Sequence, residues 1–220
     1  MDDLEVLPAH IREPELCRRR TGRLGGLVTR PFGVRLDDTT SQRWMEVVSL
    51  FRIIDDFLDG VPSDNFEERT ALVRQKIKNP GIVTKWFPTL TPESLGEDAY
   101  RQIETFGDRI VRLNHFIKTT DSPDRYLSLR RAEGRESARL LVALASPAMQ
   151  QQAHFERFKK GMDMVGETIN LLDSFLDIGG DARRGEINFQ PSLGFRAKLL
   201  GNAACVAVSY LPAVYNRRAS

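Results

Sequence analysis

The most regular pattern of apolar positions in this chain runs from Trp44 to Leu58. Apolar side chains recur there every three or four residues, which is typical of one face of an α-helix. Residues 39–41 are Thr, Thr and Ser, which favour a helix N-cap, and Gly60 is followed by Val and Pro, which favour a helix end. We therefore predict a helix up to Gly60. Its last turns carry three aspartates: Asp55, Asp56 and Asp59.

The same periodicity predicts the remaining secondary structure. Helices are expected over residues 13–22, 64–78, 92–118, 124–145, 147–177 and 193–214, whereas residues 82–90 fit either a loop or a brief helix. Pro and Gly are frequent in residues 1–38, so this segment is expected to be an N-terminal arm. No segment shows the alternating pattern of a β-strand. The sequence therefore predicts an all-α fold.

Composition narrows the class of protein. With 220 residues the chain has room for a sizeable core, and residues 1–220 are expected to form a single domain. A net charge of +2 gives no indication of a nucleic-acid partner. Two cysteines indicate neither a disulfide framework nor a thiolate zinc site, so a cytoplasmic location is expected. The acidic N-terminus does not resemble a secretory signal, and residues 199–214 are too short and too polar for a transmembrane span.

The three aspartates at the end of the first long helix need an explanation. Residues three and four apart lie on one side of a helix, so Asp59 shares a small volume with Asp55 and Asp56. Carboxylates held this close repel one another, which favours a cation between them. Oxygen ligands suit Mg²⁺, which often brings a phosphate-bearing substrate. The alternative is a set of solvated aspartates at a frayed helix end.

A second acidic stretch occurs on the helix predicted to end near residue 177. Asn170, Asp173, Ser174 and Asp177 are three, four or seven residues apart and form one polar stripe, while the neighbouring positions are apolar. This pattern is typical of a helix that lines an internal polar site. Residues 181–186 follow with side chains of both signs, which could close over an anion.

Arginines dominate the helix between the two acidic stretches. Arg131, Arg135 and Arg139 lie four residues apart and form one basic stripe. Guanidinium groups suit the paired oxygens of a diphosphate, although ion pairs with Glu133 and Glu136 would explain the stripe equally well. In the middle of this helix Gly134 is unfavourable by about 1 kcal/mol relative to alanine, so a close approach or a helix break is expected there.

Residues 41–186 resemble the class I isoprenoid synthases. Asp55, Asp56 and Asp59 match the first aspartate-rich motif of that superfamily. The second motif matches in two registers: Asp177 and Asp181 with the following ARRGEI are similar to squalene and phytoene synthases, whereas Asn170 and Ser174 are similar to terpene cyclases. In the cyclase register the third residue, usually Glu, is Ile178 here. The segment YLSLRR, which ends in Arg130 and Arg131, resembles the helix that carries the diphosphate-sensing arginine of bacterial cyclases.

The resemblance implies a helical bundle around a central apolar cavity, with Mg²⁺, in more than one ion, between the two motifs. The metal ligands it implies are Asp55, Asp56, Asp59, Asn170, Asp173, Ser174, Asp177 and Asp181. The implied diphosphate ligands are Arg52, Arg130, Arg131, Arg135 and Arg184, and the residues expected to be catalytic are Asp55, Asp59 and Arg131.

Three functions remain open on the sequence. The first is a lyase that ionises a prenyl diphosphate and cyclises or eliminates to a terpene. The second is a transferase like squalene or phytoene synthase, which joins two prenyl chains head to head. The third is a non-catalytic helical partner subunit of a synthase, motivated by Ile178 at the third position of the cyclase register. Homodimerisation is open as well.

Overall fold

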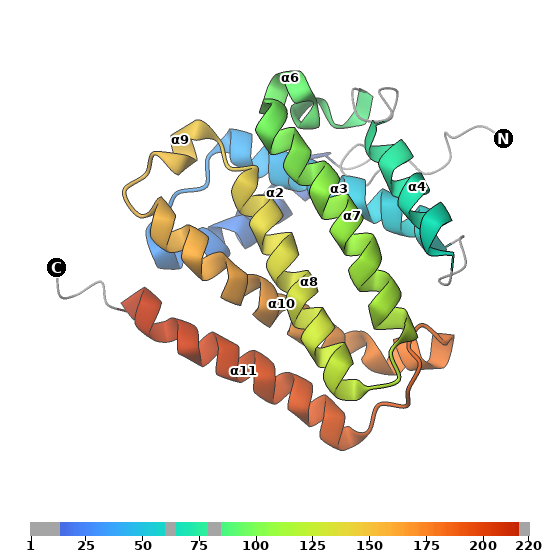
Figure 1. Ribbon diagram of the computed structural model, residues 1–220. Helices are drawn as coiled ribbons and strands as arrows, with labels where there is room; N and C mark the ends of the chain where they lie inside the picture. The colour runs from blue at the N-terminus through green and yellow to red at the C-terminus, as the bar shows by residue number, and fades with distance from the viewer. Residues whose placement is uncertain (1–13, 60–64, 79–84, 216–220) are drawn as a thin grey trace. The chain divides into compact units, whose positions relative to one another are not determined.

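The computed structural model describes residues 14–59, 65–78 and 85–215, and this part of the chain is helical and contains no strand (Figure 1). The all-α prediction is confirmed. The elements are α2 (Pro14–Thr29), η1 (Arg30–Phe32), α3 (Asp38–Asp59), α4 (Phe66–Lys78), η2 (Pro88–Leu90), α6 (Pro92–Leu95), α7 (Glu97–Thr119), α8 (Pro123–Ala143), α9 (Pro147–Gln150), α10 (Phe155–Arg184) and α11 (Leu193–Tyr215).

The chain forms two compact units, each of which is described by itself. The first unit comprises residues 1–108 and 143–155, and the second comprises residues 109–142 and 156–220. One boundary falls inside α7, one at the last residue of α8 and one at the first residue of α10. The chain therefore changes unit within helices and not in long loops.

Helix α3 is the centre of the first unit and contacts α2, α4 and η2. Its apolar stripe is buried as the periodicity predicts, with Trp44, Val47, Leu50 and Ile54 at most 4% exposed. The N-cap differs from the prediction: the carboxylate of Asp37 accepts a hydrogen bond from the backbone N of Thr40 at 2.7 Å. A carboxylate two residues before the Thr-Thr-Ser run therefore begins the helix.

Other boundaries also differ from the predicted ones. Helix α2 runs to Thr29, beyond the predicted end at residue 22. Gly96, at φ 83°, separates α6 from α7, where the sequence predicted one continuous helix. Ser146 caps the short α9 through its side chain, and a separate α10 begins at Phe155. Asn65 caps the start of α4: its side chain accepts a hydrogen bond from the backbone N of Glu68 at 3.2 Å and donates to the carboxylate of Glu68. Asp64, where the sequence predicted this helix to begin, lies outside the described residues.

In the second unit α8 and α10 approach each other closely at two glycines. A Cβ added to Gly134 would overlap the backbone of Gly166, and a Cβ added to Gly166 would overlap the carbonyl oxygen of Gly134 and lie 2.7 Å from the Cβ of Ala138. Only glycine on both helices permits this approach. The mid-helix Gly134 is therefore explained by close helix packing, which is one of the two outcomes the sequence left open.

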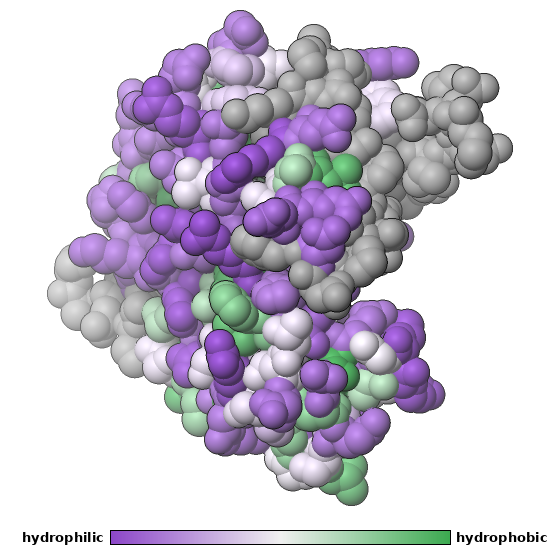
Figure 2. All heavy atoms as spheres, turned by 45° about the vertical axis from the view of Figure 1, so that its right-hand side comes forward, coloured by the Kyte–Doolittle hydropathy of each residue, from purple (hydrophilic) through white to green (hydrophobic). Residues whose placement is uncertain are grey.

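The core of the second unit joins α8, α10 and α11. Tyr126, Leu171, Ile178 and Leu199 are each at most 1% exposed and belong to one apolar cluster. Helix α10 continues through Gly179 and Gly180 to Arg184, beyond the predicted end near residue 177. Among the described residues, no helix has the length and apolar character needed to cross a membrane. On the face drawn in Figure 2, hydrophilic residues cover most of the described surface, with apolar residues interspersed among them.

Candidate functional site

Arg130 on α8 connects this helix to the polar stripe of α10. Its Nε donates to the hydroxyl of Ser174 at 2.6 Å, and its Nη2 lies 3.4 Å from the carboxylate of Asp173. On its own helix, its Nη1 forms an ion pair with Glu133 at 2.6 Å. The side chain of Arg130 is only 16% exposed, so this cation is held mostly away from water. Burial lowers the pKa of Arg130, but the surrounding negative groups, Glu133 first, outweigh burial and raise it.

Asn170 and Ser174 complete the contact between the two helices. The side-chain amide of Asn170 donates to the carbonyl oxygen of Arg130 at 2.5 Å and to the carboxylate of Glu133 at 2.9 Å. Ser174 is fully buried, and its hydroxyl donates to the carbonyl oxygen of Asn170 at 2.8 Å. The structure therefore brings together Arg130, Asn170 and Ser174, which the sequence had assigned from two separate motifs.

The third position of the cyclase register is Ile178, whose side chain has no oxygen that could bind a metal ion. Ile178 is fully buried in the apolar core of the second unit. The carboxylate beside Asn170 comes instead from the facing helix, because the close approach at Gly134 places Glu133 against α10. The sequence had treated Glu133 only as an ion-pairing partner. Spacing along one helix gives no signal for a residue supplied by another, so this position could not be found from α10 alone.

Two carboxylates of α10 carry raised pKa values. Burial raises the pKa of Asp173, and repulsion from Asp177 and Glu133 adds to it, while Arg130 acts in the opposite direction. Burial also raises the pKa of Asp181, helped by Glu186 and opposed by Arg184. A cation placed near these carboxylates would lower both pKa values, because it would favour their charged forms.

The residues that resemble the second motif of squalene and phytoene synthases lie on the last two turns of α10. Asp181 forms an ion pair with Arg184 at 2.6 Å, and Arg184 also pairs with Glu186. Asp177 is exposed one turn earlier. Asp177, Asp181 and Arg184 thus share one helix end, but Arg184 is 60% exposed and is held by carboxylates of its own segment.

Arg131 and Arg135 lie apart from the Arg130 contacts and share one partner. Both donate to Glu167 of α10, each at 2.6 Å. Glu167 is 6% exposed and was not anticipated from the sequence. Arg139 pairs with Asp163 at 2.7 Å and with Glu136 at 3.0 Å. The basic stripe is therefore neutralised by carboxylates, most of them on α10 and not on α8 as the ion-pair alternative supposed.

The first aspartate motif lies on the last turns of α3, in the first unit. The side chains of Asp55, Asp56 and Asp59 lie outside the described residues, so their convergence with the second motif stays a prediction. Arg52 lies one turn before them and is exposed.

The resemblance implies Mg²⁺, so the side chains of the second unit can be checked for suitable metal ligands. Within the described ranges, no group of three or more His, Cys, Asp or Glu residues could hold a metal ion. The side chains that surround Arg130 offer oxygen atoms from Glu133, Asn170, Asp173 and Ser174. Oxygen ligands of this kind suit hard cations such as Mg²⁺, Ca²⁺ or Mn²⁺.

Comparisons with protein-family models, curated protein sequences and solved structures found no match for this chain.

Proposed function

We propose that this chain is a Mg²⁺-dependent isoprenoid synthase that ionises a prenyl diphosphate and forms a terpene by cyclisation or elimination. The contact of Arg130 with Asn170 and Ser174 carries this proposal. In the cyclase register Arg130 is one of two candidates for the diphosphate-sensing arginine, beside Arg131, and Asn170 and Ser174 are two members of the second metal motif. Their contact across α8 and α10 supports the proposal, because a diphosphate held by the arginine would lie beside the oxygen ligands of the motif.

The proposed reaction begins when the bond between the allylic carbon and the diphosphate oxygen breaks and both electrons leave with the diphosphate. Arg130 would donate hydrogen bonds to the departing oxygens, since its planar guanidinium suits paired acceptors. Asn170, Ser174 and Asp173 would hold Mg²⁺, whose charge stabilises the leaving group.

Arg130 must exchange partners to take this role. At present its charge is neutralised by Glu133 and Asp173. A diphosphate competes for the same guanidinium, and Mg²⁺ near Asp173 would weaken the carboxylate contact further. Glu133 would then keep Asn170 oriented through its 2.9 Å hydrogen bond.

The experiment is incubation of the full chain with geranyl, farnesyl or geranylgeranyl diphosphate and Mg²⁺, with diphosphate release and product mass as readouts. Arg130→Met is expected to lower kcat/KM by about 100-fold or more, because it removes donors aimed at developing charge. Arg139→Met is the matched control on the same helix, since Arg139 is 53% exposed and pairs with Asp163. Circular dichroism confirms folding of both variants. Release of no diphosphate by the native chain from any of the three substrates would contradict the proposal.

A head-to-head prenyltransferase is a second candidate, favoured by the grouping of Asp177, Asp181 and Arg184 at one helix end. A product with a doubled carbon skeleton would identify it in the same incubation.

A non-catalytic partner subunit is the third candidate, and the buried Ile178 favours it. It predicts that a diphosphate analogue binds equally to the native chain and to Asp55→Ala in the presence of Mg²⁺. Weaker binding by Asp55→Ala favours the synthase.

A further inference from the structure

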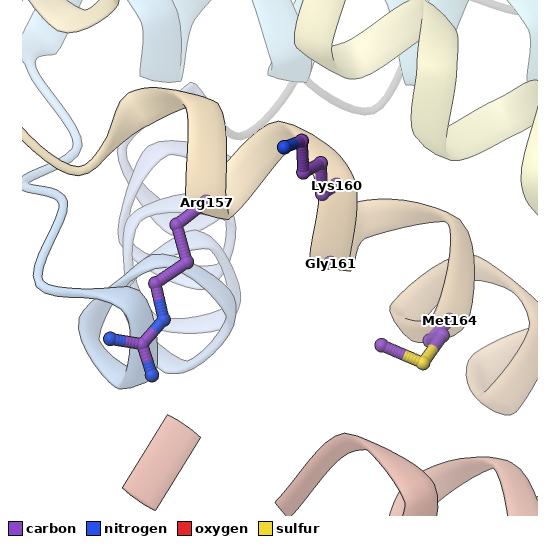
Figure 3. A pocket seen from close by; sticks show the side chains of 4 residues that line it. All are labelled: Arg157, Lys160, Gly161 and Met164. Atoms are coloured by element: carbon purple, nitrogen blue, oxygen red, sulfur yellow. The ribbon is translucent and has the colours of Figure 1, made fainter. Parts of the chain in front are cut away.

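The N-terminal half of α10 lines a pocket that none of the preceding functions uses. Its volume is about 320 Å³, and its lining residues are Arg157, Lys160, Gly161 and Met164 (Figure 3). This is room for about ten water molecules and lies at the lower end of the range for small-molecule sites. Figure 3 shows Gly161 between Arg157 and Met164 along the helix, where the absence of a side chain leaves space.

The pocket continues a face of α10 that is apolar and covered further along the helix. Arg157, Met164, Leu171 and Ile178 follow one another at seven-residue intervals, so they lie on nearly the same face. Leu171 and Ile178 are fully buried in the cluster that contains Leu199 and Ala203 of α11. Towards the start of α10 this face carries Met164 and Arg157 and borders the pocket instead.

The end of this face that borders the pocket carries positive charge, unlike the end that is buried against α11. The Nη2 atom of Arg157 is buried and has no hydrogen-bond partner in the described part of the chain. A buried guanidinium donor without an acceptor is unfavourable. Arg157 gains an acceptor if its guanidinium turns towards an oxyanion in the pocket that this residue lines. Lys160 is exposed and adds a second positive charge, and none of the lining residues in the described part of the chain is acidic.

We propose that this pocket binds an amphiphilic oxyanion: a phosphate or carboxylate held by Arg157, with a short apolar chain against Met164. The planar guanidinium suits the paired oxygens of either headgroup, and Lys160 strengthens the attraction. The unbranched thioether of Met164 adapts to an apolar chain of variable shape. Met164 precedes Ser174 by ten residues, or roughly 15 Å of helix, so this site is separate from the contacts of Arg130.

The test is calorimetric titration of the full chain with decyl phosphate and with decanoate, each below its micelle concentration. One molecule is expected to bind per chain, and the headgroup that binds more tightly identifies the class of natural ligand. Decanol and inorganic phosphate are each expected to bind at least about tenfold more weakly, because each lacks one half of the recognition. Equal binding of decanol and decyl phosphate would overturn the role of Arg157, and equal binding of inorganic phosphate would overturn the role of the apolar pocket.

Variants locate the binding on α10. Arg157→Gln is expected to weaken binding by about tenfold or more, and Lys160→Gln by a smaller factor. Met164→Trp should also weaken binding because it fills the pocket, which keeps the test decisive if Arg157→Gln does not fold. Lys159→Gln is the matched control: Lys159 is a neighbouring exposed cation, 4.0 Å from Glu156, and does not line the pocket. Unchanged binding in Arg157→Gln and Met164→Trp would contradict the proposal. Arg130→Met is expected to bind normally, so this result is independent of the proposed synthase activity.

Discussion

Glu46 in the first unit and Glu167 in the second are both buried carboxylates, but they are held in different ways. Glu46 is fully buried and accepts hydrogen bonds from the backbone N of Thr89 at 2.9 Å, from the hydroxyl of Thr89 at 2.8 Å and from the side chain of Gln42 at 2.8 Å. Glu167 is 6% exposed and is bound by Arg131 and Arg135. One carboxylate is satisfied by uncharged donors and the other by two cations.

Glu46 therefore has a structural role, whereas Glu167 neutralises two cations. Thr89 belongs to η2, so Glu46 connects this short helix to α3, and loss of Glu46 would leave partly buried donors without acceptors. The partners of Glu167 are 38% and 33% exposed, so both arginines could turn to water or to an anion. Glu167 thus holds two cations between α8 and α10. Its removal should lower the free energy of unfolding by less than the removal of Glu46.

The largest expected effect comes from breaking the helix contact on which the charged network of the second unit depends. Gly166→Ala adds a Cβ that overlaps the backbone of α8, so the helices must separate or shift. We expect a loss of about 3 kcal/mol in the free energy of unfolding, measured by chemical denaturation. Glu46 should keep its hydrogen bonds, because they lie within the first unit.

Gly201→Ala on α11 is the matched control for this substitution. A Cβ on Gly201 meets nothing within 4 Å, so the better helix propensity of alanine should stabilise the protein by up to about 1 kcal/mol. Equal stability of Gly166→Ala and Gly201→Ala would show that the close approach of α8 and α10 is wrong.

The second prediction removes the structural carboxylate. Glu46→Ala leaves the partly buried backbone N and hydroxyl of Thr89 without their acceptor, and a loss of about 2–3 kcal/mol is expected. Glu46→Gln keeps one acceptor oxygen and should lose about half as much. The measurement is again the denaturation midpoint. Almost no loss in Glu46→Gln, beside the full loss in Glu46→Ala, would mean that the volume of the side chain matters and its second oxygen does not.

The third prediction removes the carboxylate that is bound by cations. Glu167→Ala should cost about 1–2 kcal/mol, less than Glu46→Ala, because Arg131 and Arg135 can be hydrated once they are released. Added salt should reduce this loss by screening the two unpaired arginines, but should not change the loss in Glu46→Ala. A loss in Glu167→Ala that exceeds that of Glu46→Ala would contradict the distinction between the two carboxylates.

The fold could be predicted from the sequence to the extent that local patterns decide it. The apolar stripe of α3 and the all-α class followed from periodicity. The helix breaks were harder: Gly96 ends α6 in a left-handed conformation, whereas Gly179 and Gly180 remain helical. Ile178 is buried in the core on the same turn, and this packing outweighs the low helix propensity of the two glycines. Sequence alone does not indicate which glycines are supported by packing.

The candidate site shows the same division. The sequence placed Arg130, Asn170 and Ser174 on the correct helices, because their spacing within each helix defines a face. It missed Glu167 and the role of Glu133, because only the crossing of α8 and α10 determines which side chains meet. Pairing across helices depends on long-range packing, which periodicity does not encode.

The smallest expected effect concerns how the stability of the protein depends on pH through one carboxylate of each unit. Burial raises the pKa of Asp37, but hydrogen bonds from Ser146 and Thr40, with the charge of Arg43, outweigh burial and lower it. Its contribution to stability is therefore present above the unfolded pKa and lost as the pH falls through the folded pKa. The pKa of Asp173 is raised, so its contribution is present at low pH and lost as the pH rises through the folded pKa.

Asp37→Asn and Asp173→Asn test this opposition when denaturation midpoints are followed from acid to neutral pH. Asp37→Asn should be less stable than the native chain at neutral pH, and this difference should shrink in acid. Asp173→Asn should gain on the native chain as the pH rises, by a small amount because Asp173 is 59% exposed. Asp121→Asn, at an exposed residue between α7 and α8, is the control for the substitution itself. Slopes of the same sign for Asp37→Asn and Asp173→Asn would contradict the prediction, since the two carboxylates would then lie in electrostatically similar surroundings.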